Sequence, residues 1–301
     1  MNSEINAVIV TYNPDITSFS EVVRGLLGQV DMIIIIDNAS KNILEIERTI
    51  KGTQVELIKF SENKGIAAAQ NKGISYADSQ EAKYILLMDQ DTVLPKGAVA
   101  ALCRECTDLE RRGLRVAAVG CAYRDTHDGK LNAIWKANGR KLERQEVNSG
   151  SKRIVEVDFV ISSGSLIPMS TLRAVGLMEE GLFIDLVDVE WGLRAKYQGY
   201  QSYQSFTHIM THTLGSGRQK VLWKSVALHS PIRNYYSIRN SIFLARRHYI
   251  GLAWRLYFIR RIFPYFLVFG FFPKQKWPRV RAMIRGLFDG IFSREGPIGF
   301  N

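Results

Sequence analysis

The stretch YILLMDQDTVL, residues 84–94, decides the fold class of this 301-residue chain. Its apolar run is too short for a buried helix, so it predicts a central strand that is covered on both faces. Ligands of open α/β sheets bind at the carboxyl ends of the strands, which places Asp89 and Asp91 at the mouth of a crevice. Two carboxylates there suit a divalent cation with a bound phosphate, although a lone Asp-x-Asp also fits a polar turn.

Three more strands are expected before this stretch, at residues 5–11, 32–36 and 55–60, with helical patterns between them. Alternating strands and helices predict a parallel sheet with helices on both faces. Each expected strand ends in polar residues, so four polar strand ends meet at one edge of the sheet: Thr11, Tyr12 and Asn13; Asp37 and Asn38; Asn63 and Gly65; Asp89 and Asp91.

In this order, the motifs VIVTYNP, IIIDNAS, NKGIAAAQNKG and LLMDQDT resemble the nucleotide-sugar half of the inverting, metal-dependent glycosyltransferases with a GT-A fold. The likeness is to the large family 2, and in particular to bacterial rhamnosyltransferases. It covers residues 5–94 and implies an α/β fold with a mostly parallel, Rossmann-like central sheet flanked by helices. We expect a catalytic domain at 1–245, with a nucleotide-sugar half (1–112) and an acceptor half (113–245), and a helical, membrane-associating segment at 246–301.

The resemblance assigns the nucleotide to the first two strand ends. Asp37 matches the acid that accepts a hydrogen bond from the imide N–H of a uracil or thymine ring. Thr11, Tyr12 and Asn13 match the strand end that lines the base and ribose. A helix cap through Asp-Asn-Ala-Ser is the alternative for Asp37.

The diphosphate and its metal are assigned to the later strand ends. Asn63, Gly65 and Asn71 match the loop and helix that pack beneath the nucleotide, with loop closure as the alternative. Asp89 matches the residue on the ribose side, and Asp91 matches the ligand of Mg²⁺ or Mn²⁺. Sugar transfer needs such a cation because charge develops on the leaving nucleoside diphosphate.

A second acid-rich stretch, FIDLVDVEWGLR, spans residues 183–194. Its three acids lie among apolar residues, and a crowded carboxylate has the raised pKa that a general base requires. The stretch resembles the acceptor-side motif of the family, which assigns the catalytic base to Asp188. Asp185, Glu190 and Trp191 are then expected to bind or flank the acceptor. An acidic first turn of a helix is the alternative interpretation.

Three further segments carry weaker signals. Gly164, in a small-residue turn, permits close backbone approach near the transferred sugar or serves as an ordinary turn. His212 matches an additional metal ligand in several relatives, and its nitrogen would favour Mn²⁺. Arg233, Tyr235 and Arg239 lie in a helix-forming segment that either closes over the diphosphate, faces the acceptor or packs conventionally.

The net charge of +11 is concentrated at the carboxyl end, where residues 246–301 hold eleven Lys and Arg against two acids. The longest uncharged run, 262–273, is shorter than the ~20 residues of a membrane-spanning helix. Aromatic residues with a basic border instead predict an element in the headgroup region of an anionic leaflet, with a homodimer interface or a helical cap on the catalytic domain as the alternatives. These aromatic residues are Trp254, Tyr257, Phe258, Phe263, Tyr265, Phe266, Phe269, Phe271, Phe272 and Trp277.

Composition excludes several other classes. Three cysteines are too few for a disulfide framework and fit a reducing compartment. Cys103 and Cys106 form a C-x-x-C within an expected helix, without a second pair for zinc. No targeting signal is visible, so we expect the chain in the cytoplasm, peripheral on the inner membrane face. Nucleic acid is not expected as a partner despite the basic and aromatic pattern.

Together these features predict transfer of L-rhamnose from dTDP-β-L-rhamnose to a polyprenyl-diphosphate-linked glycan, as in O-antigen or rhamnan synthesis. UDP-galactofuranose and UDP-hexoses remain open as donors. The rival from another class is a haloacid-dehalogenase-type phosphatase with Asp89 as nucleophile. It is disfavoured because three strand-helix units precede the motif and Asp37 would have no role. A non-catalytic nucleotide-sugar binder is disfavoured by the intact Asp91 and Asp188.

Overall fold

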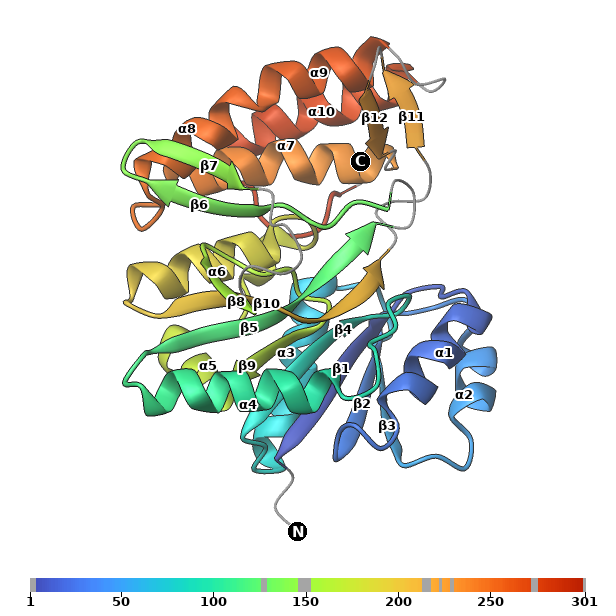
Figure 1. Ribbon diagram of the computed structural model, residues 1–301. Helices are drawn as coiled ribbons and strands as arrows, with labels where there is room; N and C mark the ends of the chain where they lie inside the picture. The colour runs from blue at the N-terminus through green and yellow to red at the C-terminus, as the bar shows by residue number, and fades with distance from the viewer. Residues whose placement is uncertain are drawn as a thin grey trace.

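The computed structural model describes residues 4–125, 129–145, 153–212, 218–221, 224–227, 230–271 and 276–299. Within 212–229 only the strand backbone is described. An eight-stranded sheet forms the centre, in the order β3-β2-β1-β4-β9-β5-β10-β8 (Figure 1). Its strands are β1 (Ile5–Thr11), β2 (Met32–Asp37), β3 (Val55–Lys59), β4 (Tyr84–Asp89), β5 (Val116–Asp125), β8 (Ile154–Val157), β9 (Ser165–Pro168) and β10 (Gln201–His212).

The sheet is mostly parallel, as the sequence predicts. β1 pairs in parallel with β2 and with β4, β2 pairs in parallel with β3, and β5 pairs in parallel with β10. β9 and β8 are antiparallel to their neighbours. The chain first runs outward from β1 to β3 and then crosses to β4 on the other side of β1. This reversal makes the carboxyl ends of β1 and β4 a topological switch point, where open α/β sheets bind ligands.

Helices cover both faces of the sheet because its central strands are apolar on both sides. In β2, Ile33 and Ile35 enter one core, and Ile34 and Ile36 enter the other. The first core includes residues of α1 (Ile16–Leu26), α2 (Ile43–Ile50) and α4 (Ala98–Arg111). The second includes residues of α3 (Ile66–Ser79), α5 (Met169–Val175) and α6 (Val187–Tyr197). The result is the three-layer arrangement that the alternating pattern predicts.

The small residues of α3 allow this helix to lie close to the sheet. Ala67 and Ala69 are fully buried. A methyl group added at Gly73 would lie 2.4 Å from Cγ1 of Val8 on β1. Close approach fixes where the amino end of α3 and its preceding loop meet the crevice, which is why this helix matters for the site.

A layer of carboxyl-terminal helices lies over one side of the sheet (Figure 1). It contains α7 (Pro231–Arg246), α8 (Leu252–Arg260), α9 (Ile262–Phe271) and α10 (Lys276–Ile291). The hairpin of β6 (Ile134–Asn138) and β7 (Lys141–Gln145) packs beside α8, while β11 (Arg218–Val221) pairs with β12 (Lys224–Ala227). Gly286 and Gly290 let α10 lie against the backbone of α7.

The aromatic carboxyl-terminal segment is only partly a surface, which corrects the expectation for three of its members. Trp254, Phe258 and Phe269 are 3%, 0% and 3% exposed. Trp254 is drawn inward because its Nε1–H donates to the buried carboxylate of Asp158 at 2.7 Å. Among the described helices, none is both long and apolar enough to cross a bilayer.

Two short strands complete the second half of the sheet. β8 ends at Val157, although apolar residues continue to Ile161, because Asp158 turns into the interior, where it pairs with Lys196 and accepts from the Ala137 N–H at 2.7 Å. β9 has only four residues, Ser165–Pro168, and carries no period that would reveal it in sequence. It nevertheless joins β4 to β5 and so connects the two halves of the sheet.

Candidate active site

The nucleotide end of the switch point is built by β1 and β2. Thr11 donates its hydroxyl to Oδ1 of Asp37 at 2.9 Å, and Oδ2 of Asp37 accepts from the Ser40 N–H at 2.9 Å. Asp37 is only 2% exposed, so its orientation is fixed. The Ser40 contact closes a turn after β2 and does not cap a helix, because α2 begins at Ile43 with Asn42 as its N-cap. It leaves each carboxylate oxygen able to accept again.

Gln90, which is not among the residues expected to form the site, links the ends of the paired strands β1 and β4. Its Oε1 accepts from the Tyr12 N–H at 2.8 Å, and its Nε2 lies 3.4 Å from the Tyr12 carbonyl. The residue between two acids of a D-x-D motif is the signal that could have found it. The Tyr12 side chain is 47% exposed beside this bridge, where it is free to contact a ligand.

Three asparagines shape the neighbouring loops. Asn13 has φ 48°, accepts from the Lys41 N–H at 2.8 Å and donates its own N–H to Ser40. Asn63 accepts from Nδ2 of Asn38 at 3.0 Å and from the Gly65 N–H at 2.9 Å. These contacts hold the loops after β1, β2 and β3 together at one edge, as the four polar strand ends predict.

Gly65 and Asn71 connect this edge to the second half of the chain. Gly65 has φ 86°, and a methyl group there would lie 2.5 Å from the carbonyl oxygen of Phe183. Asn71 is buried and bonds both the N–H and the carbonyl of Met178, at 2.9 and 3.0 Å, and also Glu180 at 2.8 Å. The structure therefore gives the Asn71 amide protein partners, which is the loop-closure role left open by the sequence.

Asp89 and Asp91 follow β4 at the switch point. Burial and the nearby Asp91 charge raise the pKa of Asp89 to about 7, and the Arg233 guanidinium opposes this. Asp91 is exposed, and its Oδ1 lies 3.4 Å from the Thr92 hydroxyl. Two close carboxylates, one of them open to solvent, fit a divalent cation by the chemistry of the donors.

The backbone places the His212 segment near this pair. Thr211 forms a bridge with Val93, two residues after Asp91. The His212 side chain lies outside the described residues, so its expected role as a ligand stays a prediction. His208 lies beside Gly97 instead. No cluster of three metal-binding side chains is found within the part of the chain that the structure describes.

Asp188 lies in the first turn of α6 and faces Asp89. The pKa of Asp188 is raised to about 6, chiefly by burial; the Val189 N–H, donating at 2.8 Å, opposes the shift, and the Asp89 charge contributes to it. Asp188 also lines a small, largely apolar cavity with Leu87 and Trp191. The electrostatic effect of Asp89 on Asp188 indicates that the two acid motifs, about a hundred residues apart in sequence, lie in one site.

The turn before β9 lies against both acids. The Ser163 hydroxyl accepts from the Asp89 N–H at 3.2 Å. Gly164 has φ 72°, and a methyl group there would lie 2.8 Å from the sulfur of Met210. Its N–H donates to Leu87, and its carbonyl accepts from Cys121, so Gly164 shapes the sheet behind the site.

The loop before Asp188 has a strained backbone. Phe183, Asp185 and Leu186 have φ of 64°, 64° and 65°, a region that costs non-glycine residues about 1–3 kcal/mol each. Asp185 forms an ion pair with Arg233 of α7, with Nη2 and Oδ1 2.5 Å apart. Because Arg233 also acts on Asp89, one guanidinium lies between the two acid motifs.

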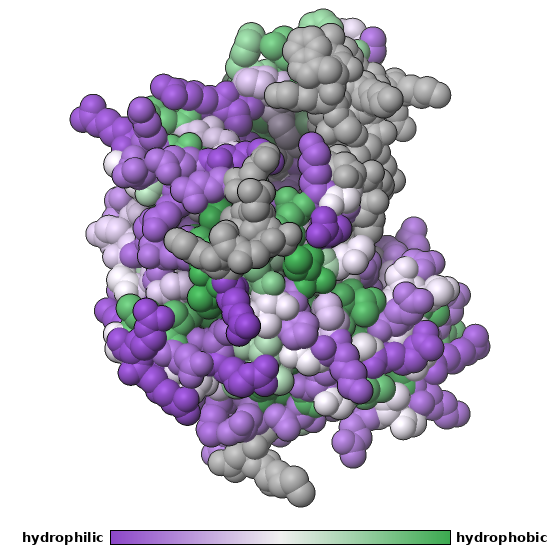
Figure 2. Space-filling view, viewed as in Figure 1, coloured by the Kyte–Doolittle hydropathy of each residue, from purple (hydrophilic) through white to green (hydrophobic). Residues whose placement is uncertain are grey.

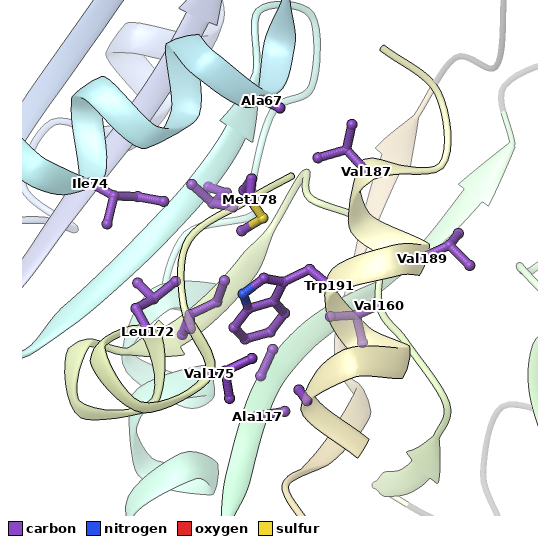
Figure 3. Packing of buried hydrophobic residues seen from close by; sticks show 14 of the residues in the cluster. Ala67, Ile74, Ala117, Val160, Leu172, Val175, Met178, Val187, Val189 and Trp191 are labelled. Atoms are coloured by element: carbon purple, nitrogen blue, oxygen red, sulfur yellow. The ribbon is translucent and has the colours of Figure 1, made fainter. Parts of the chain in front are cut away.

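The two remaining residues of the acid motif are interior. Glu190 is fully buried, accepts two bonds from Arg194 at 2.8 and 3.0 Å, and accepts from the Tyr249 hydroxyl at 2.7 Å. Trp191 is 3% exposed and donates to the Gly176 carbonyl. Figure 3 shows its ring among Met178, Leu172, Val175 and Val160. These contacts favour supporting roles over direct acceptor binding.

Comparison with known proteins gives a family match and one close relative. Residues 7–163 match the family Glycosyl transferase family 2. The chain is 32% identical over 257 residues to the dTDP-rhamnosyl transferase RfbF of Shigella flexneri, covering 84% of this chain and 83% of that protein.

Solved structures share the fold at low identity. S. aureus TarS residues 1–349 in complex with UDP-GlcNAc has a TM-score of 0.59 at 15% identity, over 97% of this chain and 81% of that one. GalNAc-T7 with UDP, GalNAc and Mn²⁺ has a TM-score of 0.57 at 13% identity, over 90% of this chain and 58% of that one. Both similarities support the same three-layer architecture.

Proposed function

The chain belongs to glycosyl transferase family 2, and from that premise we propose that it transfers L-rhamnose from dTDP-β-L-rhamnose to a lipid-linked glycan with inversion. One observation carries the proposal: the two acid motifs lie at one strand edge, where Arg233 forms an ion pair with Asp185 and also acts electrostatically on Asp89, and the Asp89 charge acts on Asp188. A donor site and a base therefore share one crevice. The relative from Shigella flexneri supports the choice of the dTDP-sugar.

In this mechanism the chain's residues hold the donor and remove one proton. Asp37, fixed by Thr11, would accept the imide N–H of the thymine ring, Asp89 would lie on the ribose side, and Asp91 would hold Mg²⁺ or Mn²⁺. When bound, the cation acts as a Lewis acid on the diphosphate. The acceptor oxygen forms a bond to the anomeric carbon as the bond from that carbon to the diphosphate breaks, and Asp188 takes the hydroxyl proton.

Arg233 completes the charge arrangement. Its guanidinium is paired with Asp185 and faces Asp89, with 38% of its side chain exposed. A planar guanidinium with open faces binds phosphate oxygens in a fork geometry. We assign it to the diphosphate, where it would add positive charge opposite the leaving group.

A donor panel tests the proposed activity directly. The protein would be assayed with dTDP-β-L-rhamnose, UDP-galactofuranose, UDP-glucose and UDP-GlcNAc, with release of the nucleoside diphosphate as the readout. The proposal expects dTDP-β-L-rhamnose to be turned over fastest in the presence of Mg²⁺ or Mn²⁺. Preferred turnover of a UDP-sugar would contradict the assigned donor and would leave the glycosyltransferase class intact.

The carboxyl-terminal helices support a membrane-bound acceptor. We define the apolar face as Phe263, Leu267 and Phe271 of α9 with Trp277 and Phe288 of α10, which are 42–76% exposed. Figure 2 shows apolar surface at the upper edge of the molecule, over this layer. The two acids of residues 246–301 are Asp289, buried in ion pairs, and Glu295, so basic side chains dominate around the face. Apolar side chains among basic ones fit the headgroups of anionic lipid, where a polyprenyl-diphosphate-linked acceptor resides.

Vesicle sedimentation tests this assignment. The variant Phe263→Ser/Phe271→Ser/Trp277→Ser should lose binding to phosphatidylglycerol vesicles, whereas the control Leu44→Ser, 63% exposed on α2, should retain it. Retained binding by the triple variant would contradict the docking role. Loss of a homodimer in the triple variant, without any vesicle binding by the wild type, would assign the face to self-association instead.

A further inference from the structure

Groups from other elements hold the loop at residues 181–186 by donating hydrogen bonds to its backbone carbonyls. This loop contains Asp185 and leads into Asp188. Between η1 (Glu180–Leu182) and α6, three residues have left-handed backbone angles, a conformation that does not persist unless its surroundings impose it. The backbone carbonyls of residues 181–185 need hydrogen-bond donors when they are buried, so the groups that bind them can impose this conformation.

Buried side chains of α7 bind four of these carbonyls. Nη2 of Arg239 donates to Gly181 at 2.8 Å and to Leu182 at 2.9 Å. Nδ2 of Asn240 donates to Leu182 at 3.0 Å, to Ile184 at 2.8 Å and to Asp185 at 2.8 Å.

The fifth carbonyl is bound from the other half of the chain. The Ile66 N–H, at the start of α3, donates to the Phe183 carbonyl at 2.7 Å. The Phe183 ring also stacks on Tyr236 of α7, with centroids 4.9 Å apart. The loop is thus fixed between α3, which follows the nucleotide loop, and α7.

Arg239 and Asn240 are both fully buried, so neither reaches a substrate. Arg239 also donates to the Gly296 carbonyl, which ties it to the carboxyl-terminal tail as well. Within the described residues, the side chain of Asn240 bonds the acid loop and otherwise only Arg239, from which its Oδ1 accepts. An amide is suited to this position because its NH₂ group is neutral and donates to several oxygens from one atom.

We propose that Asn240 is a positioning residue for sugar transfer, which sets the orientation of Asp185 and Asp188 by binding the carbonyls of residues 182, 184 and 185. The proposal rests on the proposed role of Asp188 as the base. A base that is displaced by about 1 Å can lose about 100-fold in rate, so the amide affects turnover without touching the reactants.

The test compares Asn240→Asp, which keeps the shape and removes the donors, with Asn240→Ala, which adds no buried charge. The control is Ser241→Ala, because Ser241 is about as buried on α7, and in the part of the chain that the structure describes its hydroxyl bonds only the Ser237 carbonyl of its own helix. For each protein, kcat, the KM for the donor, the melting temperature and hydrogen exchange of residues 181–190 would be measured.

Both Asn240 variants should lose roughly 10- to 100-fold in kcat per folded molecule, keep a donor KM close to the wild type, and exchange faster in 181–190. Ser241→Ala should change none of these. An unchanged kcat in folded Asn240 variants overturns the proposal, even if their melting temperature falls. Should neither variant fold, hydrogen exchange of wild-type residues 181–190 decides, and exchange at open-loop rates overturns it.

The measurements distinguish a failure of the proposed sugar-transfer function from a failure of the positioning role of Asn240. Faster exchange in the Asn240 variants, with no transfer by the wild type from any donor of the panel, would support the positioning of the loop and contradict the assigned reaction. Transfer by the wild type that the Asn240 variants match would contradict the positioning alone.

Discussion

The two acid motifs of the crevice reach it in different ways. Asp89 and Asp91 continue a regular strand, β4, whose position follows from its parallel pairing with β1. Asp185 lies within a strained loop that is fixed by α3 and α7, and Asp188 follows that loop. The first motif is placed by local pattern and sheet pairing, and the second by contacts from residues far away in sequence. Substitutions at the two motifs should therefore fail in different ways.

The largest effect is expected at the base. Asp188→Asn keeps the size of the side chain and removes its ability to take a proton, so kcat should fall about 1,000-fold. Donor affinity should stay near the wild-type value, because the nucleotide contacts lie on other elements. Isothermal titration with dTDP and a transfer assay measure the two quantities. Turnover near the wild-type rate would remove Asp188 from the mechanism.

A smaller loss is expected at the strand end. Asp91→Ala should reduce turnover by roughly 100-fold, because it removes a ligand of the cation that neutralises the diphosphate. Unlike Asp188→Asn, it should also weaken nucleotide binding, and EDTA should have little further effect on it. Asp108→Ala, at an exposed acid of α4, is the matched control. Nucleotide affinity that is independent of both Asp91 and EDTA would count against the metal site.

The pH dependence of kcat should identify Asp188, in the second acid motif, as the base. With the pKa of Asp188 at about 6, the base is increasingly protonated below that pH, and kcat should fall to roughly a tenth by pH 5. A rate that stays flat between pH 5 and 8 in the wild type would argue against a carboxylate base with this pKa.

Stability should follow the opposite trend with pH. Raised pKa values of Asp89 and Asp188 mean that the folded state binds more protons than the unfolded chain between about pH 4 and 7. Stability without metal should therefore decrease as the pH rises through this window. Thermal unfolding of the wild type and of Asp89→Asn would measure it, and the variant should show a shallower decrease.

The smallest effect on activity is expected at Glu190, two residues after the base. Glu190→Gln leaves Arg194 without its charge partner in the interior, so the free energy of unfolding should fall by about 2–3 kcal/mol. The rate per folded molecule should change little, because the Glu190 carboxylate contacts only Arg194 and Tyr249 among the described side chains. A large loss of kcat with unchanged stability would show that Glu190 acts on the acceptor.

The features that could be predicted from sequence are those placed by local pattern and sheet pairing, and the features that could not are those placed by distant contacts. The first four strands, the small-residue helix and the meeting of polar strand ends follow from local periods and from the rules of parallel sheets. The grouping of Asp188 with Asp89 came from the resemblance, because no local signal relates residues a hundred positions apart. The interior roles of Glu190 and Trp191 depend on partners such as Tyr249 and Gly176, which only the tertiary structure brings near.

The same limit explains the residues that were missed. Asn240 acts through the carbonyls of a loop 55 to 58 residues earlier in the chain, and Gln90 acts through the backbone of Tyr12. Backbone acceptors are present in every sequence, so such contacts leave no pattern. The carboxyl-terminal aromatic residues do leave a pattern, because their spacing indicates helices. That pattern does not predict which of them are buried, since the burial of Trp254 depends on Asp158, which is distant in sequence.

The central claim is that Asp91 and Asp188 act across one crevice on one bound donor. A crystal structure of the protein with Mn²⁺ and dTDP tests it most directly. The account predicts manganese coordinated by Asp91, the thymine ring against Asp37, and the diphosphate between Asp91 and Arg233, with Asp188 facing the open end of the diphosphate. Nucleotide bound away from the carboxyl ends of β1 and β4, or an Asp188 screened from it by protein, would contradict the account.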